Sequence, residues 1–265
     1  MLILKYDLNL RILKITFLGT GTSQGIPVIT CGCEVCQSDD PRDNRLRVSV
    51  LLETADKTIV IDSGPDFRYQ MLRAKVKDLD AIVYTHEHKD HVAGLDDIRP
   101  FNYLLRKNID IYATVRVQEA LKKEFSYIFA EKVYPGVPQI NMHTVTGENF
   151  HIGQTEFIPL DIMHYKLPIL GYRIGDFTYI TDAKTIPQVS MDKIRGTKIL
   201  VVNALQKEEH ISHFTLSEAI AFAEDIGAET TYFTHMSHNL GKHADIEAEL
   251  PPNIRLAYDG LQIEL

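Results

Sequence analysis

The chain has 265 residues, of which 45% are hydrophobic and 24% are charged, and its formal net charge is −8. This is the composition of an ordinary globular protein, and the negative charge argues against broad nonspecific binding of nucleic acid, which needs a basic face. A chain of this length forms one large domain or two small ones. Because no Gly-, Pro- or Ser-rich linker and no internal repeat interrupts it, we predict a single domain over residues 1–265.

The same bulk features bear on the location of the protein. No apolar run reaches the roughly 20 residues that a membrane-spanning helix needs. The first residues are interrupted by Lys5, Asp7 and Arg11, which is not the pattern of a secretory signal peptide. The cysteines number 3, all within residues 31–36, and an odd cluster is not a disulfide framework. We therefore expect a cytoplasmic protein that does not contact a membrane.

Runs rich in Val, Ile, Tyr, Phe and Thr predict strands along the whole chain. They lie at 12–19, 48–53, 58–62, 80–85, 109–113, 155–162, 171–175, 177–181, 198–202, 230–234 and 261–265. The clearest helix is predicted over 215–227, where Thr215 and Glu218 form a capping box and Gly227 ends the apolar periodicity. Weaker helical patterns occur at 66–75, 96–106, 116–130 and 242–249. Strands and helices mix in both halves, which predicts an α/β fold of two packed sheets with helices outside.

The strongest motif follows the strand predicted at 80–85. The sequence YTHEHKDHVAG contains His86, His88, Asp90 and His91. Imidazoles and carboxylates so closely spaced are typical ligands of divalent metals. Alternation along the loop places His86 and His88 on one side, and Asp90 and His91 around the turn, where they can face a second ion. The alternative is a polar surface loop, but histidine is uncommon and this spacing is very specific.

This motif resembles the H-x-H-x-D-H signature of the metallo-β-lactamase superfamily and matches it in full. The resemblance implies an αββα sandwich, with two mixed sheets, helices on the outer faces and two metals at one edge. It also implies a His, an Asp and a His after later strands, and His164, Asp182 and His235 each follow a β-rich run. Open sheets present their sites at such strand ends.

The ligand assignment is likewise implied by the resemblance. One metal takes His86, His88 and His164, the other takes Asp90, His91 and His235, and Asp182 bridges the two. Asp62 resembles the buried aspartate that supports the metal loop of the family. A bridging aspartate in place of a cysteine favours the phosphodiesterases and thioesterases of the superfamily. The expected cofactors at this catalytic site are two divalent metals, Zn²⁺ or Mn²⁺.

His213 is the candidate for the acid that protonates a leaving group. It lies two positions before Thr215, and the segment HFTLSEA resembles the His-x-Thr segment of the phosphodiesterase branch, which includes the tRNA 3′-processing nucleases. There the histidine acts as a general acid near the metals. The alternatives are an ordinary surface histidine beside a helix cap, or the use of His210 instead. We predict Asp90 and His213 as catalytic residues.

The three cysteines form the pattern C-x-C-x2-C. Residues 18–36, LGTGTSQGIPVITCGCEVC, resemble the opening of the branch that contains the phosphoribosyl cyclic phosphate phosphodiesterases of phosphonate breakdown and the pyrroloquinoline-quinone biosynthesis B proteins. A structural zinc is tetrahedral, so three thiolates need a fourth donor, for which His238 is the best candidate. The segment THMSH, which contains His238, resembles the T-H-x-S-H segment of these phosphodiesterases, in which the second histidine completes a structural zinc site. We predict one structural Zn²⁺ held by Cys31, Cys33, Cys36 and His238; the alternative is reduced cysteines in a mobile loop.

These observations predict a metal-dependent hydrolase that cleaves a small phosphodiester, such as a cyclic ribose phosphate, with a metal-bridging hydroxide. A thioesterase or lactonase of the same fold, a tRNA 3′-processing-like nuclease and a non-catalytic metal-binding module are the alternatives. The partner is a small substrate rather than nucleic acid, and a homodimer is common in the family that the sequence resembles. Arg99 and Lys166 are either phosphate contacts or ordinary surface charges.

Overall fold

A computed structural model describes residues 13–130 and 134–265, so position 12 of the strand predicted at 12–19 lies outside the described residues. Within the described ranges the fold has two seven-stranded mixed sheets. The first contains, in spatial order, β14 (Gln262–Glu264), β1 (Lys14–Gly19), β2 (Ser49–Glu53), β3 (Thr58–Ile61), β4 (Ala81–Val83), β5 (Ile109–Ala113) and β6 (Ile140–Thr144).

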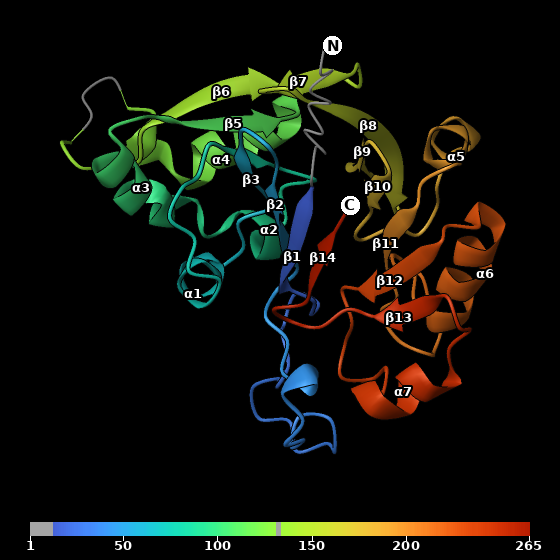
Figure 1. The fold of residues 1–265 in the computed structure, drawn as a ribbon. Helices are drawn as coiled ribbons and strands as arrows, with labels where there is room; N and C mark the ends of the chain where they lie inside the picture. Colours follow the sequence, from blue (N-terminus) through green and yellow to red (C-terminus); the bar gives the residue numbers. More distant parts are fainter. Residues whose placement is uncertain (1–12, 131–133) are drawn as a thin grey trace, which may run out of the picture.

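The second sheet comes entirely from residues 150–256. Its spatial order is β13 (Ile254–Leu256), β12 (Thr230–Thr234), β11 (Ile199–Asn203), β10 (Phe177–Tyr179), β9 (Leu167–Ile174), β8 (Thr155–His164) and β7 (Phe150–Ile152). Only β14 crosses over, joining the first sheet antiparallel to β1. Figure 1 shows β1 and β14 side by side at the centre of the molecule, between the two halves.

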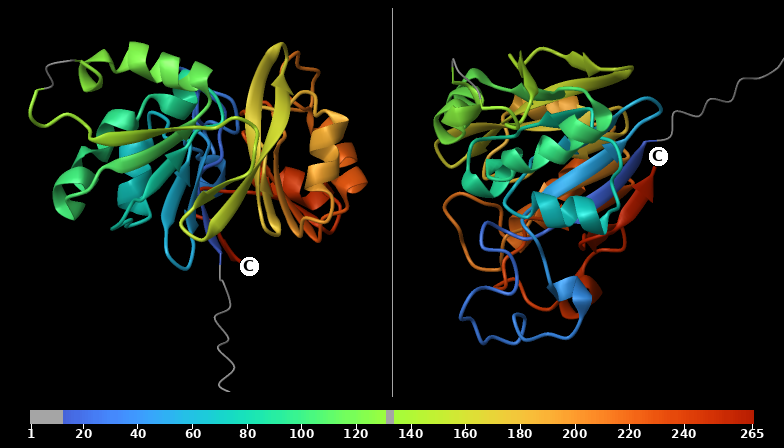
Figure 2. Two further views of the ribbon diagram at one scale, coloured as in Figure 1. Left: turned by 90° about the horizontal axis from the view of Figure 1, so that it is seen from above. Right: turned by 90° about the vertical axis from the view of Figure 1, so that its left-hand side faces the viewer.

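Helices cover the outer face of each sheet. The first half contributes α1 (Phe67–Arg73), α2 (Lys89–Val92), α3 (Arg99–Leu105) and α4 (Val115–Glu124), with 3-10 turns at Pro41–Asp43, Leu95–Ile98 and Ser126–Ile128. The second half contributes α5 (Gln188–Ile194), α6 (Leu216–Ile226) and α7 (His243–Glu249). Seen from above, these helices lie on the two outer sides, with the sheets between them (Figure 2). This αββα arrangement confirms the predicted fold class.

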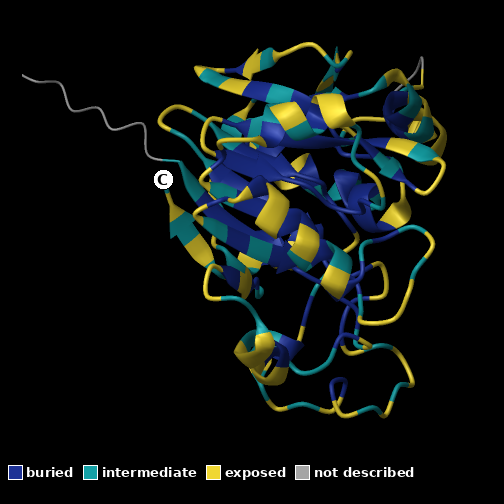
Figure 3. Cartoon of the chain, turned by 90° about the vertical axis from the view of Figure 1, so that its right-hand side faces the viewer, coloured by how far each residue is buried: buried dark blue, intermediate teal, exposed yellow. Residues whose placement is uncertain are grey.

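Apolar side chains fill three layers of this sandwich. Phe17, Val50 and Ile61 of the first sheet pack against Phe157 and Tyr172 of the second. Separate clusters pack α1, α3 and α4 onto the first sheet and α5, α6 and α7 onto the second. Figure 3 shows the central strands as the most buried part of the chain. Because both faces of each sheet are covered, the free strand ends remain as the places where polar side chains can gather.

The structure differs from the sequence prediction mainly in short elements. β9 begins at Leu167 rather than at 171. The sequence does not indicate this earlier start, because Pro168 and Gly171 are unusual in strands, but β9 pairs with β8 along this whole stretch. The helix predicted at 116–130 ends at Glu124 and continues as a 3-10 turn. α2, α5, β6, β7 and β13 were not predicted. None of the helices in the described residues combines the length and apolar composition needed to cross a membrane.

Candidate metal centre

The predicted metal-binding residues come together at one edge of the two sheets. Asp90 and His91 lie in α2, just after β4, while Asp182 follows β10 and His235 follows β12. One side-chain donor atom from each of these four buried residues lies within 4.8 Å of all the others. The first two belong to one sheet and the last two to the other, so this group exists only when the sandwich is assembled. Their identity as metal ligands remains a prediction.

Distances within this group place Asp182 at its centre. The Nε2 atom of His91 lies 3.4 Å from Oδ2 of Asp182, and Nε2 of His235 lies 3.1 Å from its Oδ1. Asp90 lies opposite, with Oδ2 3.2 Å from His91 Nε2 and 3.6 Å from His235 Nε2. Asp182 thus lies next to His91 and His235, and one of its oxygens also lies within 4.8 Å of donor atoms of His164 and His213. Its role as a bridge between two metals remains a prediction.

The other three predicted ligands adjoin this group. The Nε2 of His86 is 3.1 Å from Nδ1 of His88. Ring centroids of His86 and His88 lie 4.6 Å apart, and those of His88 and His164 lie 5.3 Å apart. The Nδ1 of His164 is 2.9 Å from the backbone oxygens of Asp182 and Ser212, so Nδ1–H donates there and leaves Nε2 free to bind a metal.

Asp62 supports the centre from below, as predicted. Its carboxylate accepts hydrogen bonds from the backbone N–H of Thr85 (2.8 Å) and the hydroxyl of Thr85 (2.7 Å). The Oδ2 atom of Asp62, which accepts from the Thr85 hydroxyl, also lies 2.7 Å from Nδ1 of His91. A proton on Nδ1 of His91 leaves its Nε2 as the free lone pair toward Asp90 and Asp182.

The donor set fits a cation. Burial alone lowers the pKa of His91, but the carboxylates of Asp90, Asp182 and Asp62 outweigh burial and raise this pKa well above its usual value. The cluster therefore attracts positive charge. Among the described residues, Nε2 of His91 and both ring nitrogens of His235 are buried without a hydrogen-bond partner. Buried polar atoms rarely stay unpaired, and bound divalent metals would supply the missing partner of the two Nε2 atoms, which face Asp90 and Asp182.

Backbone strain is concentrated at the same strand ends. Asp62, Asp182 and His235 have φ angles of 63°, 57° and 54°, in the left-handed region that side chains normally avoid. Such strain persists where surrounding contacts impose it, typically at functional sites. Gly64 adds a close approach, because a Cβ atom there would lie 2.0 Å from the backbone oxygen of Asp90. The loop that holds the candidate ligands is thus fixed by backbone contacts as well as by side chains.

His213 lies at the edge of the centre. Its ring is 4.6 Å from the ring of His164 and 4.8 Å from that of His235, and its Nδ1 is 3.7 Å from Oδ1 of Asp182. Burial lowers the pKa of His213 to about 3, against the opposing effect of Asp182, so its imidazole is neutral at pH 7 in the free protein. His210 lies further out and is more exposed, with a ring centroid 5.1 Å from that of His213.

A contact that the sequence did not reveal ties two parts of the centre together. Arg116, in α4, lies with Nε 3.0 Å from the carboxylate of Glu87, which stands between His86 and His88. The same guanidinium donates to the backbone oxygen of Pro168 on β9. Arg116 thus connects the histidine loop with the hairpin that carries His164. No local signal marks it, because the three segments are distant in the sequence.

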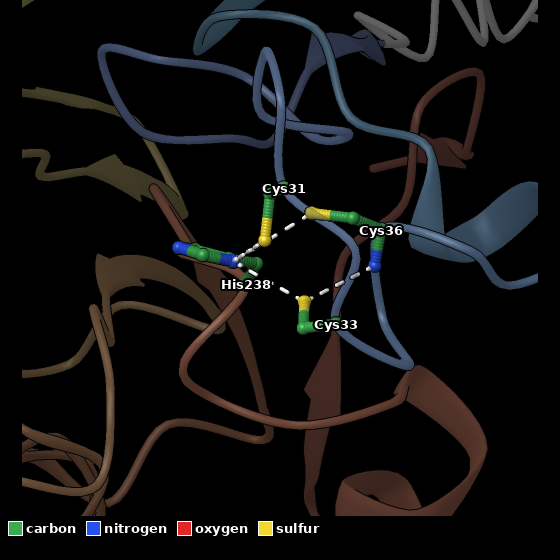
Figure 4. A group of neighbouring side chains, drawn as sticks. All are labelled: Cys31, Cys33, Cys36 and His238. Carbon is green, nitrogen blue, oxygen red and sulfur yellow. Dashed lines mark hydrogen bonds between the residues drawn. The ribbon is translucent and has the colours of Figure 1, made fainter.

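The second predicted metal site also assembles. Figure 4 shows Cys31, Cys33 and Cys36 around the imidazole of His238. Its Nδ1 lies 3.3, 3.3 and 3.6 Å from the three sulfur atoms. Zn–S bonds of about 2.3 Å and Zn–N bonds of about 2.0–2.1 Å place N and S roughly 3.5 Å apart in a tetrahedron. The geometry therefore fits the predicted zinc, whose presence remains a prediction.

A single residue links the two metal sites. Met236 lies between His235 and His238, and its N–H donates to the backbone oxygen of Thr20 at 3.0 Å. The N–H of Thr22 donates in turn to the oxygen of Met236, also at 3.0 Å. The loop that leads to the cysteines is thus held directly against the strand end that carries His235.

The two basic residues left open by the sequence differ in their surroundings. The Arg99 guanidinium lies 2.5 Å from Asp96 and also donates to the backbone oxygen of that residue, so its charge is already paired. Lys166 stands beside His164, with its ammonium 5.2 Å from the ring centroid of Tyr165.

A cavity of about 540 Å³ lies at the far end of the sandwich, between the turns that precede β3, β8 and β10, and contains none of the predicted site residues.

Comparison with known proteins agrees with this geometry. Residues 57–236 match the family described as "Beta-lactamase superfamily domain". A solved structure described as a new diphosphatase from the PhnP family superposes with a TM-score of 0.90 at 42% identity, covering 96% of this chain and 97% of that one. The chain therefore belongs to the metallo-β-lactamase superfamily. Within the superfamily it is PhnP-like, as predicted.

Two further relatives carry other names. The Zn²⁺-bound PqqB of Methylobacterium extorquens has a TM-score of 0.77 at 17% identity, covering 95% of this chain and 100% of that one. An octanoyltransferase of Porphyromonas gingivalis is 39% identical over 253 residues, which make up 94% of this chain and 51% of that protein. The chain spans about half the length of the first curated relatives that it matches.

Proposed function

We propose that this protein is a dinuclear metal-dependent hydrolase that cleaves a small phosphodiester or the related diphosphate linkage. The observation that carries the proposal is the buried group of Asp90, His91, Asp182 and His235, with Asp182 between the two histidines. When bound, a pair of divalent cations lowers the pKa of a water molecule to roughly 7 and neutralises charge on a phosphoryl group. The PhnP-like relative described as a diphosphatase supports phosphorus as the atom attacked.

The residues of the chain then have separate tasks. Asp62 fixes the ring of His91, and the backbone oxygens beside His164 fix that ring, so both present one nitrogen to the centre. Asp182 and Asp90 supply the negative charge that holds cations there. His213 stands at the edge of the centre as the acid that we propose for the leaving oxygen. A negative phosphoryl group beside its ring raises the pKa of this histidine and favours the protonated imidazole, which then donates its proton to that oxygen. The buried position of these groups keeps bulk water from competing for their hydrogen bonds.

The test uses the full chain, prepared metal-free and then loaded with Zn²⁺ or Mn²⁺, with bis(p-nitrophenyl) phosphate as substrate. Hydrolysis should appear only after metal loading. Because p-nitrophenolate leaves without a proton, the acid is tested on a cyclic ribose phosphate, whose leaving alkoxide needs one. On that substrate His213→Ala should lose roughly 10²- to 10⁴-fold in kcat, whereas His210→Ala and the exposed His151→Ala should not. Full-rate hydrolysis by metal-free protein would contradict the proposal, and a loss in His210→Ala alone would transfer the acid role to that residue.

A second candidate is hydrolysis of an acyl thioester, favoured by the relative named an octanoyltransferase. The same metals can polarise a carbonyl oxygen, but a thiolate leaves without needing an acid such as His213. An octanoyl thioester offered in parallel distinguishes the two. Turnover of the thioester that is unchanged in His213→Ala, together with no turnover of phosphodiesters, would replace the first proposal with this one.

A further inference from the structure

The turn between β8 and β9 lies at the rim of the candidate centre. It consists of only two residues, Tyr165 and Lys166, because His164 pairs directly with Leu167. His164 is buried, with its ring 5.3 Å from that of His88 and 4.6 Å from that of His213. The next residue, Tyr165, is 48% exposed. The chain therefore passes from the metal cluster to solvent within one residue.

The backbone at Tyr165 is unfavourable for a tyrosine. Its φ angle is 56°, a conformation that favours glycine or asparagine and is rare for bulky side chains. Tight hairpin turns normally use Gly, Asn or Asp at such positions. Strained residues of this kind collect at functional sites, and in this protein Asp62, Asp182 and His235 are examples. Lys75 and Arg106 have the same conformation away from the centre, so the backbone at Tyr165 supports a role for its ring only together with its place beside His164 and Lys166.

The positive charge of Lys166, next to the Tyr165 ring, is available to bind an anion. The ammonium of Lys166 lies 5.2 Å from the ring centroid of Tyr165, within the range of a cation–π contact. Among the residues that the structure describes, no carboxylate forms an ion pair with Lys166, whereas the nearby Arg116 is paired with Glu87. An exposed aromatic plane and an unpaired cation thus stand together beside the candidate metal ligands.

We propose that Tyr165 and Lys166 bind the organic part of the substrate, the tyrosine ring stacking on a planar ring and the lysine contacting a phosphate group. This rests on the proposed function and narrows its substrate class to nucleotide-like phosphodiesters or diphosphates, which carry both features. In the reaction a water oxygen bonds to phosphorus, one P–O bond breaks with its electron pair on the leaving oxygen, and that oxygen takes a proton. A phosphate of a bare sugar offers Tyr165 no ring to stack on.

The test compares AMP with ribose 5-phosphate, which share the sugar and the phosphate but differ in the base. Both are used as competitive inhibitors of bis(p-nitrophenyl) phosphate hydrolysis by the metal-loaded chain, and their binding is also measured by calorimetry. AMP should bind roughly 10- to 100-fold more tightly, the range expected for stacking one base on an aromatic side chain. In Tyr165→Asn this advantage should disappear while binding of ribose 5-phosphate stays unchanged, and Tyr165→Phe should preserve it.

The matched control is Arg106→Asn, because Arg106 has the same left-handed backbone (φ 53°) at the end of α3. Both asparagine variants should keep or raise the melting temperature, whereas only Tyr165→Asn should change the AMP preference. Lys166→Ala should weaken both ligands alike. Equal binding of AMP and ribose 5-phosphate by the wild type, or an unchanged preference in Tyr165→Asn, would overturn the inference. Calorimetry keeps this result separate from failure of the proposed hydrolysis, because it needs no turnover.

Discussion

Removing the fourth donor of the cysteine site should destabilise the whole protein. His238→Ala leaves three thiolates with no nitrogen at the 3.3–3.6 Å separations seen here. A ligand that binds only the folded state at 100 to 1,000 times its Kd contributes about 2.7 to 4.1 kcal/mol. For a chain of 265 residues, loss of this contribution lowers the melting temperature by about 5–8 °C. Because Met236 joins the two sites, loading of the catalytic centre should also weaken.

The assay combines zinc counting by mass spectrometry with calorimetric melting, after mild chelation that removes the catalytic metals. Wild-type protein should retain about one zinc per chain, which fits a closed structural site. His238→Ala and Cys33→Ser should lose this zinc and melt earlier, while the exposed His151→Ala should match the wild type. If His238→Ala and Cys33→Ser both keep wild-type zinc content and melting temperature, the zinc site inferred from this geometry does not exist.

Two further predictions concern side chains outside the ligand sets. Arg116→Ala should raise the metal concentration needed to half-load the catalytic centre by about 10-fold, as measured by calorimetric titration. The control Arg195→Ala, which breaks a similar surface pairing with Asp225, should leave this concentration unchanged. Equal effects of the two variants would refute a positioning role for Arg116. Burial, assisted by the positive charge of Arg45, lowers the pKa of His243 to about 4 in the folded protein. As the pH falls, the histidine of the unfolded chain is therefore protonated before that of the folded chain, and the free energy of unfolding should decrease between about pH 6.5 and pH 4. Urea unfolding at a series of pH values should show a smaller loss in His243→Gln, and an identical loss would contradict this account.

The sequence predicted those parts of the centre that depend on neighbouring residues. His86, His88, Asp90 and His91 form a contiguous motif, and His164, Asp182 and His235 follow strands whose apolar character is evident. The contact of Arg116 with Glu87 and Pro168 could not be predicted, because it joins three segments through tertiary packing.

Tertiary contacts near the cysteine loop could not be predicted from the sequence either. Arg45 is buried and donates to the hydroxyl of Thr20, 25 positions away, and to the backbone oxygen of Ala257, 212 positions away. A buried arginine looks like a surface one in a linear sequence, since only the fold decides which charges lose their water. β13 and β7 were missed because, unlike the equally short β4, β10 and β14, neither lies in a longer run of strand-forming residues.

The pairing of β14 with β1 has a consequence for how the protein is made. Lys14 pairs with Glu264, a separation of 264 − 14 = 250 positions. While the chain emerges from the ribosome, β1 is an unpaired edge of the first sheet until residues 262–264 have been synthesised. Exposed edges of this kind are prone to pair with other chains, and contacts so distant in sequence form slowly. The edge at β1 therefore stays open until residues 262–264 have been made, and during this interval the nascent protein is prone to pair with other chains.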